Sequence, residues 1–225
     1  MKKRLQRSLA FLLSILTAIS CVALPAFAAD PDLSAGEDYG GGPSTVSAGS
    51  SQQGKVSIVP KPNYLEETSE KFTLTEETRI LYAPGDQSFL ETASYLHDIL
   101  RRSTGFDLQM EESAGDQAEE NTILLSKSSM ADYEEEGYFL MVEENGVTIR
   151  AYSAAGAFYG VQSLLQLLPY QVFSDTTVEG IEWTAPGVVV RDKPAYEWRG
   201  VMLDCSRQFF PVDVLKRLLD HMAGN

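Results

Sequence analysis

The sequence contains few of the residues that soft metal ions require. Its 225 residues include two cysteines, Cys21 and Cys205, and two histidines, His97 and His221. A structural zinc site takes four close ligands, usually cysteine and histidine. These residues are too few and too dispersed for such a site. We therefore expect no metal centre of this kind and no cofactor.

Positive charge is also scarce. Lys and Arg together number 18 against 32 Asp and Glu, which gives a formal net charge of −14 at pH 7. A chain this acidic is repelled by phosphate backbones and by anionic lipid surfaces. We therefore expect no nucleic acid partner and no binding to a membrane surface.

Hydrophobic residues make up 44% of the chain, which is ordinary for a folded protein and too rich for a disordered one.

Long apolar runs are missing except near the N-terminus. Residues 2–7 are rich in lysine and arginine, residues 9–19 are mostly apolar, and an Ala-Phe-Ala tripeptide ends at Ala28. This order is typical of a signal peptide with its cleavage site. We predict a signal peptide over residues 1–28, and hence a secreted or cell-surface protein with no membrane insertion after cleavage.

Cys21 leaves a second mode of export open. Residues 18–21 read Ala-Ile-Ser-Cys, which loosely resembles a bacterial lipoprotein box, although Ala18 stands where a larger aliphatic residue is usual. Cleavage after Ala28 is the favoured interpretation, and it leaves Cys205 without an intramolecular disulfide partner. The sequence around Cys205 offers no histidine to activate it, so we predict a packed thiol.

Residues 29–54 consist mostly of Gly, Ser, Ala and Pro. Such a segment cannot bury enough apolar surface to offset the entropy lost on ordering. We predict a disordered linker between the signal peptide and the folded part of the chain.

The pattern over residues 55–190 predicts an α+β domain with a helix-covered mixed sheet. Two helices are expected, one over 89–100 with Asp86 as its N-cap and Gly105 just beyond its end, and one over 154–168. His97 lies in the first helix and is expected to be solvated or packed. The expected strands are 56–59, 72–74, 79–82, 106–110, 122–125, 188–190 and a hairpin of 138–142 with 147–149.

Two segments of the sequence are strongly acidic. Residues 111–120 are interpreted as a solvated loop. Residues 132–143 match the spacing of an EF-hand calcium loop, with acids at Asp132, Glu134, Glu136 and Glu143. The long Glu side chains, the lack of flanking helix patterns and the alternating strand pattern from residue 138 argue against calcium.

Residues 191–225 predict one β/α unit. Residues 198–203 are expected to form an apolar strand, residues 204–207 a polar loop, and a helix with one apolar face begins at Pro211. Polar residues that follow a parallel strand lie where α/β folds place their chemistry.

Residues 192–207, Asp-Lys-Pro-Ala-Tyr-Glu-Trp-Arg-Gly-Val-Met-Leu-Asp-Cys-Ser-Arg, resemble the entry into the catalytic barrel of glycoside hydrolase family 20, the β-N-acetylhexosaminidases. The hairpin and residues 156–168 are similar to the second half of that family's N-terminal domain, and residues 58–62 to its opening. The resemblance implies an α+β accessory domain over 55–190, followed by the start of a (β/α)8 TIM barrel over 191–225 that is truncated here.

The resemblance also implies a substrate class, N-acetylhexosamine-containing glycans, and a role for two residues. Arg207 falls on the family's arginine that reads sugar hydroxyls, and Asp204 would hold its guanidinium in place. A plain surface salt bridge between the two is the alternative. Gln208 stands where the family usually has histidine. The family's catalytic Asp-Glu pair has no match after Gly200, so no catalytic residue is assigned and the chain alone is expected to be inactive.

Two other interpretations stay open. One is a sister glycosidase family that shares the accessory domain. The other is a non-catalytic extracellular binding or scaffold module, which would need an exposed aromatic platform; Tyr152, Phe158 and Tyr159 are its candidates.

Overall fold

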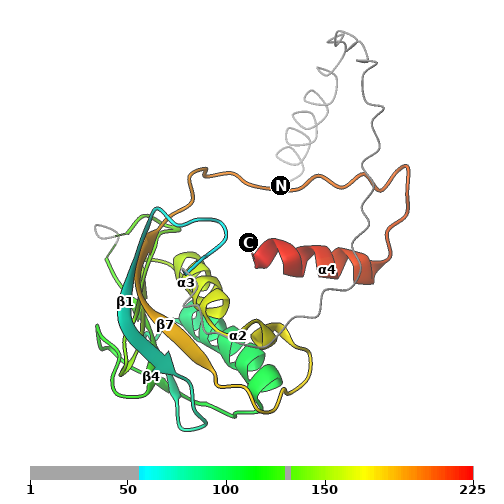
Figure 1. Ribbon diagram of the computed structural model, residues 1–225. Helices are drawn as coiled ribbons and strands as arrows, with labels where there is room; N and C mark the ends of the chain where they lie inside the picture. Colours follow the sequence, from blue (N-terminus) through cyan, green and yellow to red (C-terminus); the bar gives the residue numbers. More distant parts are fainter. Residues whose placement is uncertain (1–55, 130–132, 225) are drawn as a thin grey trace, which may run out of the picture. The chain divides into compact units, whose positions relative to one another are not determined.

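The computed structural model describes residues 56–129 and 133–224 (Figure 1). The chain divides into two units, Met1–Ser51 and Gln52–Asn225, and every described residue belongs to the second. The predicted signal peptide, Cys21 and the predicted linker lie outside the described residues. Within the described part, no helix combines the length and the apolar character that crossing a membrane requires.

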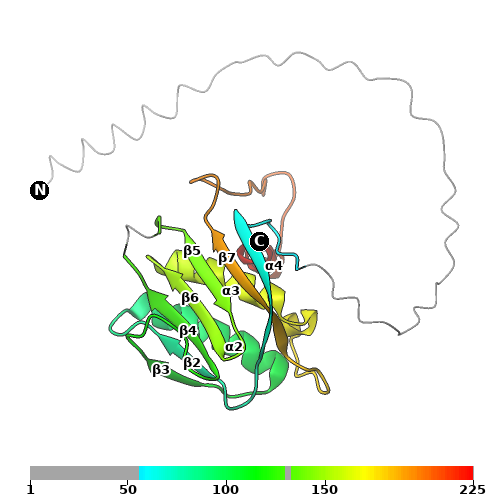
Figure 2. The same cartoon turned by 60° about the vertical axis from the view of Figure 1, so that its left-hand side comes forward.

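The described residues form a seven-stranded mixed sheet in the order β1-β7-β5-β6-β4-β2-β3 (Figure 2). The strands β3, β2, β4 and β6 pair with one another in parallel. The other pairs are antiparallel: β5 with β6, β5 with β7, and β1 with β7. The strands are β1 (Tyr64–Thr73), β2 (Arg79–Tyr82), β3 (Gln109–Glu112), β4 (Thr122–Lys127), β5 (Tyr138–Val142), β6 (Gly146–Ala151) and β7 (Thr184–Asp192).

Two helices, α2 (Gln87–Thr104) and α3 (Ala154–Leu167), cover one face of this sheet (Figure 1). Asp86 caps α2 by accepting a hydrogen bond from the Ser88 backbone N–H, and Gly105 ends the helix with φ of 80°. Glycine adopts this left-handed conformation without steric cost. Ser153 caps α3 in the same way. Both predicted helices, the Asp86 cap and the Gly105 stop are confirmed.

The core lies between the helices and the sheet. It is made by alternate residues of the strands and by the apolar faces of α2 and α3, as the sequence pattern predicts. The largest fully buried side chains are Phe72, Phe89, Ile80, Leu96, Leu100, Ile123, Leu124, Leu125, Leu140, Ile149, Leu164 and Leu165. The α+β architecture with helices on a mixed sheet is therefore confirmed, as are the predicted hairpin of β5 and β6 and the strands β2, β4 and β7.

The predicted strand over residues 56–59 is wrong. Ile58 is buried, but the backbone of Val59 bonds to the side-chain amide of Gln166, which accepts from the Val59 N–H at 2.8 Å and donates to its C=O at 2.8 Å. A side chain on α3 thus takes the place of a neighbouring strand. Pro60 and Pro62 flank the site and lack the N–H that a strand ladder needs.

Two other strands differ in extent from the prediction. β1 begins at Tyr64 rather than at residue 72, because its residues 66–71 are all polar and give no apolar alternation to reveal the strand. β3 covers Gln109–Glu112 rather than 106–110, so the start of the predicted acidic loop belongs to the sheet edge.

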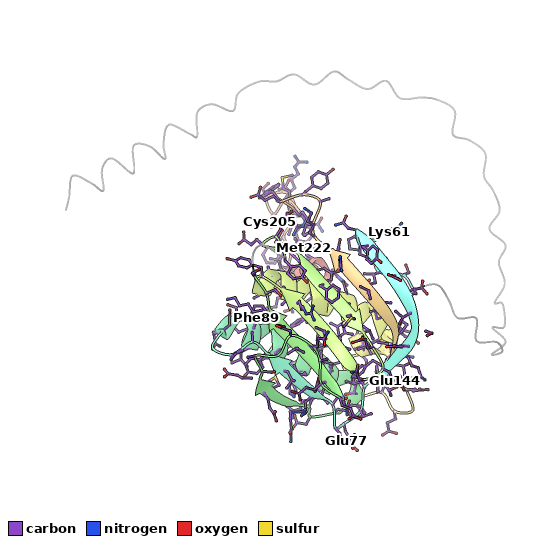
Figure 3. The ribbon with its side chains drawn as sticks, turned by 90° about the vertical axis from the view of Figure 1, so that its left-hand side faces the viewer. Lys61, Glu77, Phe89, Glu144, Cys205 and Met222 are labelled. Carbon is purple, nitrogen blue, oxygen red and sulfur yellow. The ribbon has the colours of Figure 1, made fainter. Side chains whose placement is uncertain are left out.

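The predicted strand over residues 198–203 is absent. No strand of the described residues runs beside this segment, and a strand depends on a neighbour for its hydrogen bonds. A helix, α4 (Val212–Ala223), follows as predicted, but none of its residues is buried. Cys205, predicted to be a packed thiol, is exposed because the segment around it lacks a packing partner (Figure 3).

Candidate functional site

Asp204 and Arg207 lie together in the segment between β7 and α4. Asp204 Oδ1 accepts hydrogen bonds from the Ser206 N–H at 2.9 Å and from the Ser206 hydroxyl at 2.6 Å. Its second oxygen, Oδ2, lies 3.2 Å from Arg207 Nε. The bonds from Ser206, followed by the backbone N–H of Arg207, hold the pKa of the Asp204 carboxyl below its ordinary value.

This arrangement leaves most of the Arg207 guanidinium available. The Arg207 side chain is 90% exposed, and its two terminal nitrogens carry donors that the ion pair with Asp204 does not use. The Asp204 carboxylate, which Ser206 holds in place, therefore orients the Arg207 guanidinium through its Nε edge. The geometry fits both a positioned sugar-binding arginine and a surface salt bridge, so the binding role of Arg207 stays a prediction. Gln208 is exposed beside it.

A second charged cluster, which the sequence did not predict, joins this segment to the α+β domain. Arg199 donates to both oxygens of Glu136, from Nη1 to Oε2 at 3.1 Å and from Nη2 to Oε1 at 3.1 Å. Arg199 also donates to the Tyr159 hydroxyl at 2.9 Å, and that hydroxyl donates to Glu136 at 3.2 Å. Its guanidinium carbon lies 5.7 Å from the centroid of the Tyr159 ring.

Within the cluster, the positive charge of Arg199 and the negative charge of Glu136 pair with each other. The hydrogen bond with Arg199 is the main cause that lowers the pKa of Glu136, and the same bond raises the pKa of Arg199. Two parallel N–H···O bonds between a guanidinium and a carboxylate are stronger and more directional than a single contact. The sequence marked Arg199 only as part of the Trp-Arg-Gly motif. It gave no indication that Glu136 would be its partner.

A groove of about 320 Å³ lies beside this cluster. Its walls come from residues 58–63, from α3 and from the segment after β7, and they include Tyr159, Gln166, Tyr196 and Arg199. Tyr196 is 76% exposed and Trp198 is 88% exposed. Apolar and aromatic surface therefore concentrates on the segment that follows β7.

The aromatic platform required by the binding-module interpretation is not formed by its three candidates. Phe158 is half-buried against Tyr95, with ring centroids 5.0 Å apart, and Tyr159 packs edge-on to Phe158 at 6.1 Å. Tyr152 is also half-buried. Each is engaged in the domain rather than displayed as a flat surface.

Two carboxylates of the candidate calcium loop are held in ion pairs. Glu134 pairs with Lys193 and Glu136 with Arg199, while Asp132 lies outside the described residues. Over residues 56–129 and 133–224, no three acidic, cysteine or histidine side chains come together as a metal site would require.

Comparison with known families assigns both parts of the chain. Residues 55–193 match the model described as glycosyl hydrolase family 20, domain 2, and residues 196–225 match the one described as glycosyl hydrolase family 20, catalytic domain. The chain belongs to glycosyl hydrolase family 20. The resemblance inferred from the sequence is thereby confirmed. Glu136 and Tyr159 lie in the first matched region and Arg199 in the second.

Relatives and solved structures agree with this assignment. A β-hexosaminidase of Porphyromonas gingivalis is 38% identical over 168 residues, which cover 75% of this chain and 21% of that protein. A β-N-acetylhexosaminidase of Cellulomonas fimi is 32% identical over 75% of this chain and 32% of that protein. The family 20 β-N-acetylhexosaminidase of Streptomyces coelicolor superposes with a TM-score of 0.65 at 38% identity, covering 73% of this chain and 32% of that one. The chain thus spans about a fifth to a third of the length of these relatives.

Proposed function

We propose that residues 55–225 form the accessory domain and the opening segment of the catalytic barrel of an exported β-N-acetylhexosaminidase. The observation that carries this proposal is the order of the two family 20 matches, domain 2 followed directly by the catalytic domain. The substrates would be glycans that end in N-acetylhexosamine. The basic and apolar pattern of residues 1–28 supports export.

The proposed reaction is a substrate-assisted hydrolysis with retention of configuration. The acetamido oxygen of the sugar attacks the anomeric carbon, while an Asp-Glu pair orients the acetamide and protonates the leaving oxygen. Arg207, held by Asp204, would bind hydroxyls of the terminal sugar. No glutamate follows Gly200 in this sequence. Binding by Arg207 alone does not stabilise the transition state, so the 225-residue chain by itself should not turn over.

The direct test is hydrolysis of an aryl β-N-acetylglucosaminide by two proteins. One is the 225-residue chain, and the other is that chain extended by whatever coding sequence continues its reading frame. We expect turnover by the extended protein alone. In it, Arg207→Ala should lower kcat/KM by at least tenfold through lost hydroxyl contacts, whereas Arg101→Ala on α2 should leave it unchanged.

Two outcomes would contradict the proposal. Turnover by the 225-residue chain that survives Arg207→Ala would refute both the inactivity and the role of Arg207. An extended protein that cleaves other glycosides and not N-acetylhexosaminides would favour a sister glycosidase family.

A further inference from the structure

The sheet face opposite the helices carries two arginines on either side of one aromatic ring. Tyr138 and Leu140 point into the core under α3, so strand alternation places Phe139 on the other face. Phe139 pairs in register with Arg150 on β6 and with Arg191 on β7. The guanidinium carbons lie 5.4 Å and 5.7 Å from the centroid of the Phe139 ring.

These two arginines differ from most others in the described residues. Within residues 56–129 and 133–224, neither Arg150 nor Arg191 has a carboxylate within 4.0 Å, although the chain carries an excess of acid. Arg150 Nε donates to the backbone C=O of Asp116 at 2.7 Å, and Arg191 has no hydrogen-bond acceptor among the described residues. The arginines that do pair with carboxylates are Arg79, Arg101, Arg102, Arg199 and Arg207.

The pair lines an open cleft of about 1040 Å³. Lys127, Ser128 and Gln117 lie on the same walls and add one more cation and neutral hydrogen-bonding groups. Lys127 pairs with Asp86 at 2.6 Å. Asp116 contributes the single acidic side chain among the described residues of this lining.

This arrangement leaves guanidinium donors of both arginines without a carboxylate partner among the described residues. The two positive charges lie on β6 and β7, with β5 and its Phe139 between them, and both arginines line the same cleft. The face of Phe139 stabilises each guanidinium, but a ring accepts no strong hydrogen bond from their N–H groups. An oxyanion bound in the cleft would supply acceptors for these donors.

We propose that this cleft binds an oxyanion, a sulfate or carboxylate group, through Arg150 and Arg191. The neutral walls would accommodate a sugar that carries this group, or the anion alone. The site lies within the α+β domain and uses none of the residues assigned to hydrolysis, so the proposal stands independently of the catalytic one.

The test is a titration of the 225-residue chain observed through the ¹⁵N–¹H signals of its arginine Nε groups. The probes are sodium sulfate, N-acetylglucosamine 6-sulfate, N-acetylglucosamine and a uronic acid, with ionic strength held constant by sodium chloride. We expect saturable shifts of the Arg150 and Arg191 signals with the three anions and none with the neutral sugar. Tighter binding of the sulfated sugar than of free sulfate would identify a glycan as the source of the anion.

Matched variants separate a site from general charge attraction. Arg150→Gln and Arg191→Gln should each weaken binding at least tenfold, and Asp116→Asn should strengthen it severalfold. Arg101→Gln, which removes an exposed arginine from α2, should change nothing. Arg191→Lys keeps the charge but not the planar donors, so it should bind weakly even when its thermal unfolding is unchanged. Shifts that do not saturate, or that survive Arg191→Gln, would overturn the proposal.

Discussion

Glu136 and Arg199 form a two-pronged ion pair although 63 residues separate them in the sequence. Glu136 precedes β5, and Arg199 follows β7, in the segment that matches the catalytic domain. Tyr159 on α3 contacts both, so three separate parts of the chain meet at one point. This pair gives a two-bond polar link between the α+β domain and the segment after it.

Trypsin should report on this link. Cleavage after Arg199 requires its side chain to leave Glu136, and a partly exposed pair of this kind contributes about 1 kcal/mol. We expect Glu136→Gln to speed cleavage after Arg199 about fivefold, because proteolysis follows the population of the open form. Cleavage after Arg207, whose side chain is 90% exposed, is the internal control and should not change. Equal acceleration at both sites would mean that the variant loosens the whole segment.

Asp86 should contribute stability that depends on pH. It caps α2 and binds Lys127, and the bond with Lys127 is the main cause that lowers its pKa below 3.8. Because the folded pKa lies below the unfolded one, this stabilisation is present above about pH 4 and is lost as pH falls through the folded value. Asp86→Ala should lower the free energy of unfolding by about 1–2 kcal/mol at pH 7. Urea unfolding at pH 7 and near pH 2 measures the difference, which should shrink in acid; Asp86→Asn, which keeps the cap, should lose less.

Tyr138 and Ser163 should behave as a coupled buried pair. Their oxygens lie 2.6 Å apart, and burial raises the pKa of Tyr138 to about 12. Tyr138→Phe leaves the Ser163 hydroxyl buried without its partner, which should cost about 1–2 kcal/mol. The double variant with Ser163→Ala should cost less than the sum of the two single variants. Strictly additive losses in urea unfolding would show that the contact contributes nothing of its own.

Gly156 should not tolerate alanine in spite of its place in a helix. Alanine is ordinarily the better helix former by about 1 kcal/mol. A Cβ on Gly156, however, would collide with the backbone carbonyl oxygen of Gly137, which cannot move without disturbing β5. We expect Gly156→Ala to lower the free energy of unfolding by about 1–3 kcal/mol. Gly200→Ala, where a Cβ meets no atom within 4 Å, is the control and should change it by less than about 0.5 kcal/mol.

The local parts of the fold could be predicted from the sequence because their signals are local. Asp86 and Gly105 mark the ends of α2, and the turn before Gly146 separates two alternating strands. The strands that were missed or misplaced lack such signals. Residues 66–71 of β1 are polar on both faces, and residues 56–59 look like a strand until Gln166 supplies their hydrogen bonds.

The candidate site could be predicted only where a family motif marked it. Arg207 and Asp204 were identified from the motif, and the structure brings them within 3.2 Å of each other. The cluster of Glu136, Tyr159 and Arg199 was not, because no spacing rule links a carboxylate before β5 to an arginine after β7. The same reason hid the two arginines around Phe139, which only the strand register makes neighbours.

The contact that Gln166 makes with Val59 has a counterpart four residues further along the chain, beside the same groove. The Asn63 N–H donates to Asp192 Oδ1 at 2.9 Å, and the Asn63 amide donates to the C=O of Lys193 at 3.0 Å. The points where the chain enters and leaves the α+β domain are therefore tied together. A domain whose two ends meet can be inserted into a host chain, removed from it or exchanged without stretching what lies on either side. The contacts of Asn63 thus give this domain the closely spaced ends that a transferable domain requires.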